Sequence, residues 1–226
     1  MIDISALFSV TYGMYIVCSG DKTNNNGFVS NTVFQITAEP PRFAVSCNKN
    51  NFTSEYISKY KNFSVSILHQ EASIETIGIF GYKSGRDTYK LKGMILEFGI
   101  DDVPVLLNDS LAVLELKLID TIDIGTHNIF IGELLNSKVI ETNKLPMTYN
   151  YYREVKKGFS PKNAPTYIDK TLLEKADNKQ NGKIYKCAAC GFEYIESEQN
   201  IPFDKLPESY VCPICGSDKS DFYEIS

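Results

Sequence analysis

The chain has 226 residues, a formal net charge of −5 and 43% hydrophobic residues. This length suits one mid-sized domain joined to a second, small one. The apolar runs are no longer than a strand, and the N-terminus lacks the basic and apolar regions of a signal peptide. We therefore expect a soluble cytoplasmic protein that neither crosses a membrane nor binds nucleic acid.

The first 150 residues predict a mainly β domain. Stretches rich in β-branched and aromatic residues, bounded by turn residues, predict strands. They are residues 12–18, 28–37, 41–47, 63–68, 111–119, 127–133 and 138–142. Helices are predicted at about residues 53–60 and 72–80. Many short strands without regular alternation with helices favour a barrel over a doubly wound sheet.

Residues 153–182 differ in composition from the segments on either side. Lysine, glycine and proline residues come first, and an almost wholly polar stretch follows. This composition predicts a linker, with one short helix at about residues 169–176. The linker is either flexible or an ordered strap docked on a domain. The predicted organisation is a domain at 1–152, the linker, and a second domain at 183–226.

The negative charge is unevenly distributed. Residues 183–226 hold four lysines and eight acidic residues, a net charge of −4, and the other 182 residues carry −1. An acidic domain that carries electrons would be steered toward a basic docking surface. The same acidic excess also serves ordinary solubility, so the charge alone does not decide between these roles.

Six cysteines divide into two groups. Cys18 and Cys47 lie in apolar runs, where buried small hydrophobic side chains are expected. The other four form two Cys-x-x-Cys-Gly units in the last 40 residues: Cys187, Cys190, Cys212 and Cys215. Such paired units hold one tetrahedral metal ion through four thiolates. Only two histidines occur, too few for a histidine-rich di-iron centre.

The spacing of the two Cys-x-x-Cys units leaves the metal open. A glycine after each pair allows a left-handed backbone whose N–H groups point at sulfur. The 21 residues between Cys190 and Cys212 are close to a zinc-ribbon spacing, so both zinc and iron fit. A disulfide framework is disfavoured because nothing indicates secretion.

Aromatic residues around these cysteines favour iron, because they can shield a redox metal from water. They are Tyr185, Phe192, Tyr194, Phe203, Tyr210 and Phe222. The Tyr-x-Cys-x-x-Cys-Gly-Phe-x-Tyr opening and the later Val-Cys-Pro-x-Cys-Gly unit resemble rubredoxin over residues 183–226. That resemblance implies one iron ion, Fe2+ or Fe3+, on the four cysteines. The segment between the units is shorter than usual in rubredoxins, and Tyr210 replaces the usual tryptophan.

Two polar segments follow predicted strands, at residues 27–35 and 46–53. The second opens a predicted helix, where a cation with hydroxyl and amide donors suits a terminal phosphate group. Simple helix capping explains the same residues. No Gly-x-Gly-x-x-Gly motif follows a strand and no P-loop occurs, so a dedicated dinucleotide or ATP fold is not indicated.

The order of several motifs resembles the flavin reductase family over about residues 5–150. They are Gly-x-x-Ser-Asn-Thr-Val-Phe-Gln from Gly27, Val-Ser-x-Asn-Lys-Asn from Val45, Phe-Gly-x-Lys-Ser-Gly-Arg from Phe80 and Gly-Thr-His-x-x-Phe-Ile-Gly-Glu from Gly125. The resemblance implies a split β-barrel that binds FMN (or FAD) at a homodimer interface. It also implies that NAD(P)H is a transient co-substrate.

The resemblance assigns flavin contacts to matching positions of this chain. The isoalloxazine ring would contact Ser30, Asn31, Thr32 and Val33. The ribityl chain and phosphate would contact Ser46, Asn48, Lys49, Asn50 and Thr53. His127 matches the family's histidine near the flavin and nicotinamide, although Thr126 stands where relatives often have aspartate. A surface histidine without a role is the alternative for His127.

The whole chain resembles the fusion family called high molecular weight rubredoxin. That family implies electron flow from NAD(P)H through FMN to the rubredoxin iron, and on to a flavodiiron protein that reduces dioxygen or nitric oxide. One alternative is a flavin-binding protein without turnover, whose zinc ribbon serves docking. Another is a different phosphate-ester cofactor in the barrel, as in pyridoxal phosphate oxidases.

Overall fold

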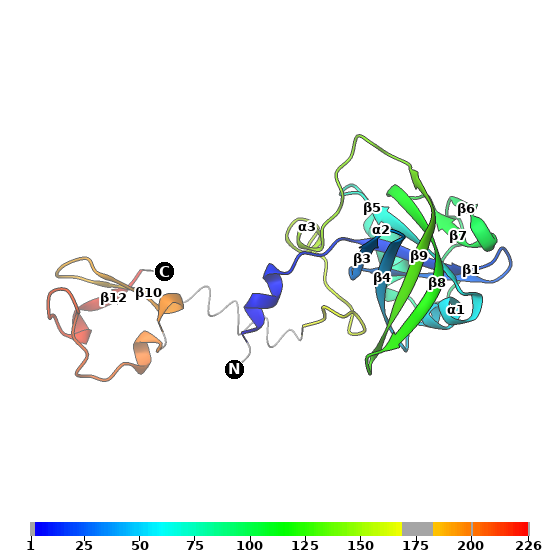
Figure 1. Cartoon of the computed structure of the whole chain (residues 1–226). Coiled ribbons are helices and arrows are strands. Elements are labelled where there is room, and N and C mark those ends of the chain that lie inside the picture. Colours follow the sequence, from blue (N-terminus) through cyan, green and yellow to red (C-terminus); the bar gives the residue numbers. More distant parts are fainter. Residues whose placement is uncertain (1–2, 169–182, 200, 226) are drawn as a thin grey trace. The chain divides into compact units, whose positions relative to one another are not determined.

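The computed structural model describes residues 3–168, 183–199 and 201–225. The chain divides into two compact units (Figure 1). Phe8–Tyr167 form the first, here called the barrel unit, and Met1–Leu7 with Ile168–Ser226 form the second, here called the four-cysteine unit. The domain boundaries drawn from the sequence stay predictions, and the helix predicted at residues 169–176 lies outside the described residues.

The barrel unit is built on one seven-stranded sheet in which all neighbouring strands are antiparallel. Its strands, in spatial order, are β2 (Asn25–Ser30), β1 (Tyr15–Gly20), β5 (Asn62–Leu68), β8 (Ser110–Asp123), β9 (His127–Val139), β4 (Pro41–Asn48) and β3 (Val33–Ala38). β6 (Leu96–Phe98) and β7 (Pro104–Leu106) form a separate two-stranded sheet, which is bonded to β5 through the Ser64 and Ser66 hydroxyls. This architecture confirms the predicted mainly β class of split-barrel type.

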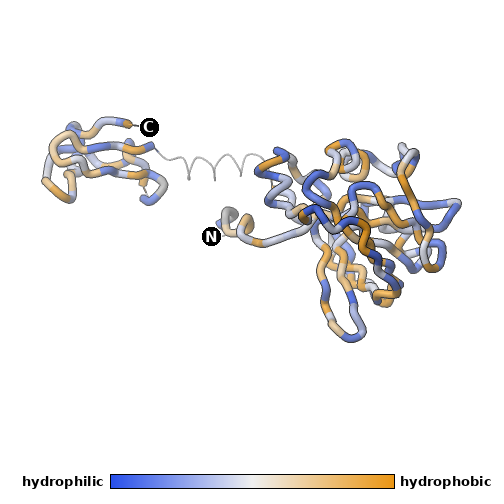
Figure 2. The backbone as a smooth tube through the Cα atoms, turned by 90° about the horizontal axis from the view of Figure 1, so that it is seen from above, coloured by the Kyte–Doolittle hydropathy of each residue, from blue (hydrophilic) through white to orange (hydrophobic). Residues whose placement is uncertain are grey.

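Strand β1 is buried on both faces. Ile16 and Cys18 pack in one core cluster and Val17 in another, because successive strand residues point to opposite faces. Double burial explains why the middle of this strand is continuously apolar rather than alternating. Hydrophobic residues recur along the strands of both units (Figure 2). Cys18 and Cys47 are both fully buried, as the sequence predicted.

Three α-helices complete the barrel unit, and both predicted helices are confirmed within two residues of their expected bounds. They are α1 (Phe52–Tyr60), α2 (Ile74–Tyr82) and α3 (Tyr149–Glu154), with a 3-10 turn at η2 (Ile100–Asp102). Another 3-10 turn, η1 (Ile4–Ser9), includes the residues at which the division between the two units falls. Asn51 and Ser73 cap α1 and α2 by accepting hydrogen bonds from main-chain N–H groups. Among the described residues, no helix has the length and apolarity needed to cross a membrane.

Two strand predictions were wrong. The segment predicted as one strand at residues 28–37 is interrupted at Asn31 and Thr32, so that β2 pairs with β1 and β3 pairs with β4 at the opposite edge of the sheet. The gap predicted between residues 133 and 138 does not exist, because β9 continues through it. Bulges in the pairing with β8 absorb the register change there, so the polar residues of this part remain in the ladder.

The four-cysteine unit has a small sheet in the order β11 (Glu193–Ile195), β10 (Ile184–Cys187), β12 (Phe222–Glu224). Short 3-10 turns lie at η3 (Glu196–Glu198), η4 (Phe203–Lys205) and η5 (Lys219–Asp221). The six predicted aromatic residues form its core together with Leu206. Phe203 is central, since its ring lies 4.2 Å from that of Tyr185 and 5.3 Å from that of Tyr194.

Candidate functional site

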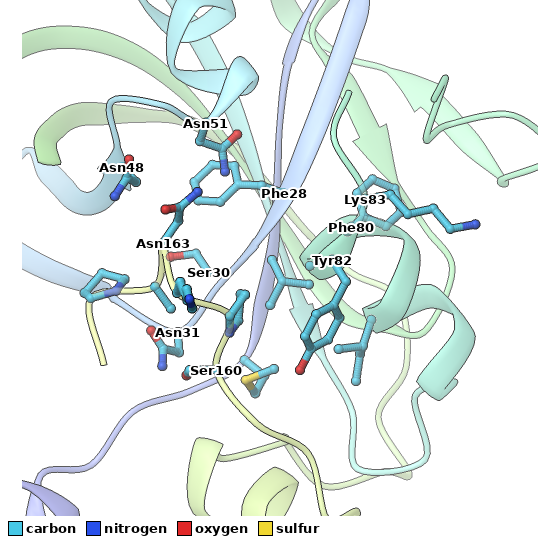
Figure 3. A pocket seen from close by; sticks show the side chains of 18 of the residues that line it. Phe28, Ser30, Asn31, Asn48, Asn51, Phe80, Tyr82, Lys83, Ser160 and Asn163 are labelled. Atoms are coloured by element: carbon cyan, nitrogen blue, oxygen red, sulfur yellow. The ribbon is translucent and has the colours of Figure 1, made fainter. Parts of the chain in front are cut away.

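A cavity of about 300 Å³ opens in the barrel unit. Its walls come from the end of β2, the end of β4, the N-terminus of α1, helix α2 and the segment at residues 159–165. Asn48 and Asn51 lie at one end and Asn31 and Ser160 at the other (Figure 3). The volume is at the lower end of the range of small-molecule pockets and accommodates a ring system.

Five of the predicted flavin contacts line this cavity: Ser30, Asn31, Ser46, Asn48 and Asn50. They come from the β2–β3 connection and from the end of β4. The fold of the sheet brings these two places together at the mouth of the cavity. The Asn48 Oδ1 accepts a hydrogen bond from the Asn50 N–H at 2.9 Å, which holds this turn in shape. Their roles as cofactor contacts stay predictions.

Four other predicted contacts lie outside the cavity lining. Val33 packs in the core beneath the sheet, and Thr32 donates its hydroxyl to Asn31 Oδ1 at 3.0 Å. Lys49 is held 2.6 Å from the Asp123 carboxylate. Thr53 is fully buried, and its hydroxyl has no hydrogen-bond partner among the described residues. Their assignment to the flavin also stays a prediction.

The polar end of the cavity combines a helix N-terminus with lysine and hydroxyl groups. Asn51 and Phe52 open α1, and residues 83–85, a Lys-Ser-Gly turn, line the opposite wall. The positive end of a helix dipole together with free N–H groups favours an anion. Arg86 lies next in the chain but is already engaged, because it pairs with Glu55 and stacks over the Phe52 ring.

His127 stands at the start of β9, directly opposite Asn48 in the β4–β9 ladder. Its Nδ1 lies 2.9 Å from the Thr126 hydroxyl, and its Nε2 lies 3.2 Å from the main-chain carbonyl oxygen of Asn163. Thr126 therefore takes the orienting position at which relatives of the resembled family often have aspartate. The catalytic role of His127 remains a prediction.

Lys90 is a cavity residue that the sequence did not reveal. It is only 5% exposed, and its ammonium group donates to the main-chain carbonyls of Gly27 at 3.0 Å and Phe80 at 3.2 Å. Burial lowers the pKa of Lys90 to about 8. The lysine follows an ordinary polar turn, and no pattern in its neighbours marks it as buried.

In the four-cysteine unit, the sulfur atoms of all four predicted ligands lie within 4.8 Å of one another. Cys187 and Cys215 are 3.7 Å apart at sulfur, and Cys190 and Cys212 are 3.6 Å apart. A tetrahedral ion with metal–sulfur bonds of about 2.3 Å needs sulfur separations of about 3.8 Å. The cluster therefore fits one such ion, iron or zinc.

The two knuckles have the same backbone geometry at their glycines. Gly191 and Gly216 both have φ of +76°, and each donates its N–H to the carbonyl of the first cysteine of its pair, at 2.9 and 2.8 Å. That φ lies in the left-handed region that glycine adopts readily. Hydrogen bonding to Ser217 lowers the pKa of Cys215.

Comparison with known proteins matches the barrel unit and the four-cysteine unit to two different families. Residues 7–159 match the family described as Flavin reductase like domain, and residues 184–222 match Rubredoxin. A high molecular weight rubredoxin of Moorella thermoacetica is 42% identical, over 99% of this chain and all of that protein. A ferric-chelate reductase (NAD(P)H) of Archaeoglobus fulgidus is 35% identical, over 74% of this chain and 98% of its own length.

Solved structures resemble the barrel unit. The flavin reductase HpaC complexed with NADP+ has a TM-score of 0.56 and 28% identity, over 64% of this chain and 89% of its own. Flavoredoxin of Methanosarcina acetivorans has a TM-score of 0.53 and 22% identity, over 57% of this chain and 69% of its own. Together these matches support an electron-transferring oxidoreductase that uses flavin and iron.

The buried charge of Lys90 gives a test by pH. Between pH 8 and 10.5 the unfolded chain holds a proton on Lys90 that the folded chain has released, so raising the pH stabilises the folded state. Relative to Lys90→Met, the free energy of unfolding of the unaltered protein should rise by about 2 kcal/mol between pH 7.5 and 9.5. Urea denaturation followed by circular dichroism, with reductant present, measures both proteins. A difference independent of pH would contradict the burial of this charge.

Proposed function

Because the chain belongs to the flavin reductase-like family and, by joining that domain to a rubredoxin unit, to the high molecular weight rubredoxin family, we propose that it oxidises NAD(P)H through bound FMN and passes electrons to its own iron. The observation that carries this proposal is the presence of both sites on one chain: an amide-lined cavity and a four-sulfur cluster of tetrahedral size. Two relatives support the choice of donor, since one is a ferric-chelate reductase (NAD(P)H) and another is a flavin reductase complexed with NADP+.

Flavin can take up two electrons as hydride and release them singly, whereas a four-thiolate iron exchanges one at a time. The residues of the chain bind and orient rather than supply an acid–base pair. Asn48, Asn50 and the α1 N-terminus would hold the phosphate end, and Ser30 and Asn31 would border the ring. Below its lowered pKa, Lys90 adds a positive charge to the wall, which favours an anionic ligand.

The electrons would leave through the four-cysteine unit to a separate acceptor in the cytoplasm. Cys190 and Cys215 are exposed, whereas Cys187 and Cys212 are buried, so one ligand of each knuckle faces the solvent. The family resemblance suggests a flavodiiron protein that reduces dioxygen or nitric oxide as this acceptor. The net charge of −4 on residues 183–226 suits a basic docking surface on it.

A homodimer is also part of the proposal. Exposed apolar side chains lie on β3, at the far end of β8 and just after it: Phe34, Ile36, Ile119, Ile122 and Ile124. Val33 and Val45 pair across β3 and β4 and face the core, so Phe34 points to the outer face of the sheet. A second copy of the chain is the partner that would cover this face.

Absorption spectroscopy with metal analysis of the purified protein tests the central proposal. We expect flavin together with about one iron per chain, and a red colour that dithionite bleaches. Extraction of the flavin after acid precipitation identifies it as FMN or FAD. A colourless four-cysteine unit with stoichiometric zinc would favour the docking role instead and would exclude the electron relay.

Substitution of one metal ligand separates the two halves of the reaction. Cys212→Ser should lose the iron and the reduction of an external acceptor, while NAD(P)H still reduces the flavin, because the cavity residues are unchanged. Ile214→Ala is the matched control, since Ile214 is an exposed non-ligand in the same knuckle and its loss should leave the iron in place. Equal loss of both activities in Cys212→Ser would contradict the modular mechanism.

Light scattering during size-exclusion chromatography tests the dimer. We expect a mass near twice the chain mass of 25.4 kDa. Phe34→Asp should shift the protein toward the monomer, because it places a charge in the apolar contact. Val139→Asp, at another exposed apolar position of the same sheet, should remain dimeric. A monomeric unaltered protein would rule out this part of the proposal.

A further inference from the structure

Residues 158–167, here called the strap, follow α3 and cross the mouth of the cavity. Residues 159–165 of the strap all contribute to the cavity wall, among them Ser160 and Asn163 (Figure 3). The strap forms no ladder with the sheet. It turns on itself through main-chain hydrogen bonds from Ala164 to Pro161 and from Tyr167 to Ala164, at 2.9 and 3.0 Å.

Two tyrosines hold the start of the strap to the barrel. The Tyr82 hydroxyl donates to the Phe159 carbonyl, and the Tyr149 and Ser160 hydroxyls are 2.6 Å apart. Both tyrosines belong to helices, Tyr82 to α2 and Tyr149 to α3. The start of the strap is therefore tied to helix side chains and not to a strand.

Thr166 anchors the other end of the strap. Its Oγ1 accepts a hydrogen bond from Asn31 Nδ2 at 2.6 Å and lies 3.0 Å from Ser160 Oγ. Like the tyrosine contacts, these are single side-chain bonds that water can replace. The strap can therefore move away from the cavity while the sheet and both core clusters of the barrel unit stay intact.

Two predicted ligand contacts have strap atoms as their partners. Asn31 donates its amide to Thr166, and His127 Nε2 lies 3.2 Å from the Asn163 carbonyl oxygen. A carbonyl oxygen only accepts, so Nε2 must carry the proton of this bond. The strap therefore occupies hydrogen-bonding groups that a bound ligand would need.

The chemistry of the His127 contact identifies the ligand. The acceptor from Asn163 is an amide carbonyl, the same group as the carboxamide oxygen of nicotinamide. The covered cavity, at about 300 Å³, suits one ring system, whereas hydride transfer needs nicotinamide to lie against the flavin ring. With the strap in place, residues 159–165 take up space beside the ring site and the histidine donor is taken.

We propose that the strap is an intramolecular competitor of the pyridine nucleotide: Asn163 holds the carboxamide position on His127 until nicotinamide displaces it. This inference rests on the proposed function. The apparent affinity for NAD(P)H is then the intrinsic affinity multiplied by the fraction of molecules in which the strap is open. Anything that weakens the strap should tighten nucleotide binding without altering the nucleotide's own contacts.

Thr166→Val tests the competition in the full-length, FMN-saturated protein. It removes a hydroxyl that anchors the strap through Asn31 and Ser160 and that does not line the cavity. Loss of the net energy of one hydrogen bond lowers the ratio of closed to open strap about fivefold. The apparent dissociation constant of NADH or NADPH, from stopped-flow flavin reduction, should fall about fivefold. Thr166→Ser keeps the hydroxyl and should match the unaltered protein. An unchanged or weaker nucleotide affinity in Thr166→Val would overturn the proposal.

Hydrogen exchange followed by mass spectrometry gives a second measurement without turnover. The oxidised nucleotides NAD+ and NADP+ are added separately to the FMN-loaded protein. Deuterium uptake by peptides that cover residues 159–167 should increase with the nucleotide that binds, because the displaced strap loses its contacts with Tyr149 and Asn31. Uptake that falls or stays constant with both nucleotides means that the strap remains closed, which overturns the proposal.

The two proposals fail differently. If NADH or NADPH reduces the flavin normally but the strap variants and exchange rates do not respond, the competition is wrong and the proposed function stands. If neither nucleotide reduces the flavin of the unaltered protein, the proposed function fails and the inference about the strap falls with it.

Discussion

The burial of β1 between two hydrophobic clusters is the constraint on which the rest of the barrel unit depends. Ile16 and Cys18 pack on one face of β1 and Val17 packs on the other. A shift of the strand register by one residue would turn each of these side chains to the opposite face and disrupt both clusters. The register of β1 sets the register of its neighbour β2. Ser30 at the end of β2, and Asn31 after it, therefore lie at the mouth of the cavity. The position of the site is thus a consequence of core packing rather than of the site residues themselves.

The four-cysteine unit positions its site residues with a much smaller hydrophobic core. Its sheet is short, and its aromatic cluster centres on Phe203. The positions of the sulfur atoms come instead from two similar turns, in which Gly191 and Gly216 close each knuckle through a main-chain hydrogen bond. Local backbone geometry therefore sets the thiols within each knuckle, and the pairing of β10 with β12 joins segments far apart in the chain beside them.

This difference decides how much could be predicted from the sequence. The knuckles and the aromatic core were predicted because the signal is local: cysteine spacing, the following glycines and dense aromatic residues. Part of the cavity followed from the motifs around Ser30 and Asn48. Lys90 and the strap were not predicted as site residues, because their contacts join segments far apart in the chain, as between Asn31 and Thr166. The strap's glycine, prolines and lysine are typical of a linker, and composition does not reveal which linkers dock.

The burial of Cys18 and Cys47 has a chemical consequence for a protein that handles reducing equivalents. Burial raises the pKa of Cys18 to about 12 and raises the pKa of Cys47 as well, so both remain protonated thiols at any physiological pH. Peroxide and disulfide exchange act on thiolates, and neither side chain offers one. The two cysteines of the barrel unit therefore present no thiolate to oxidants.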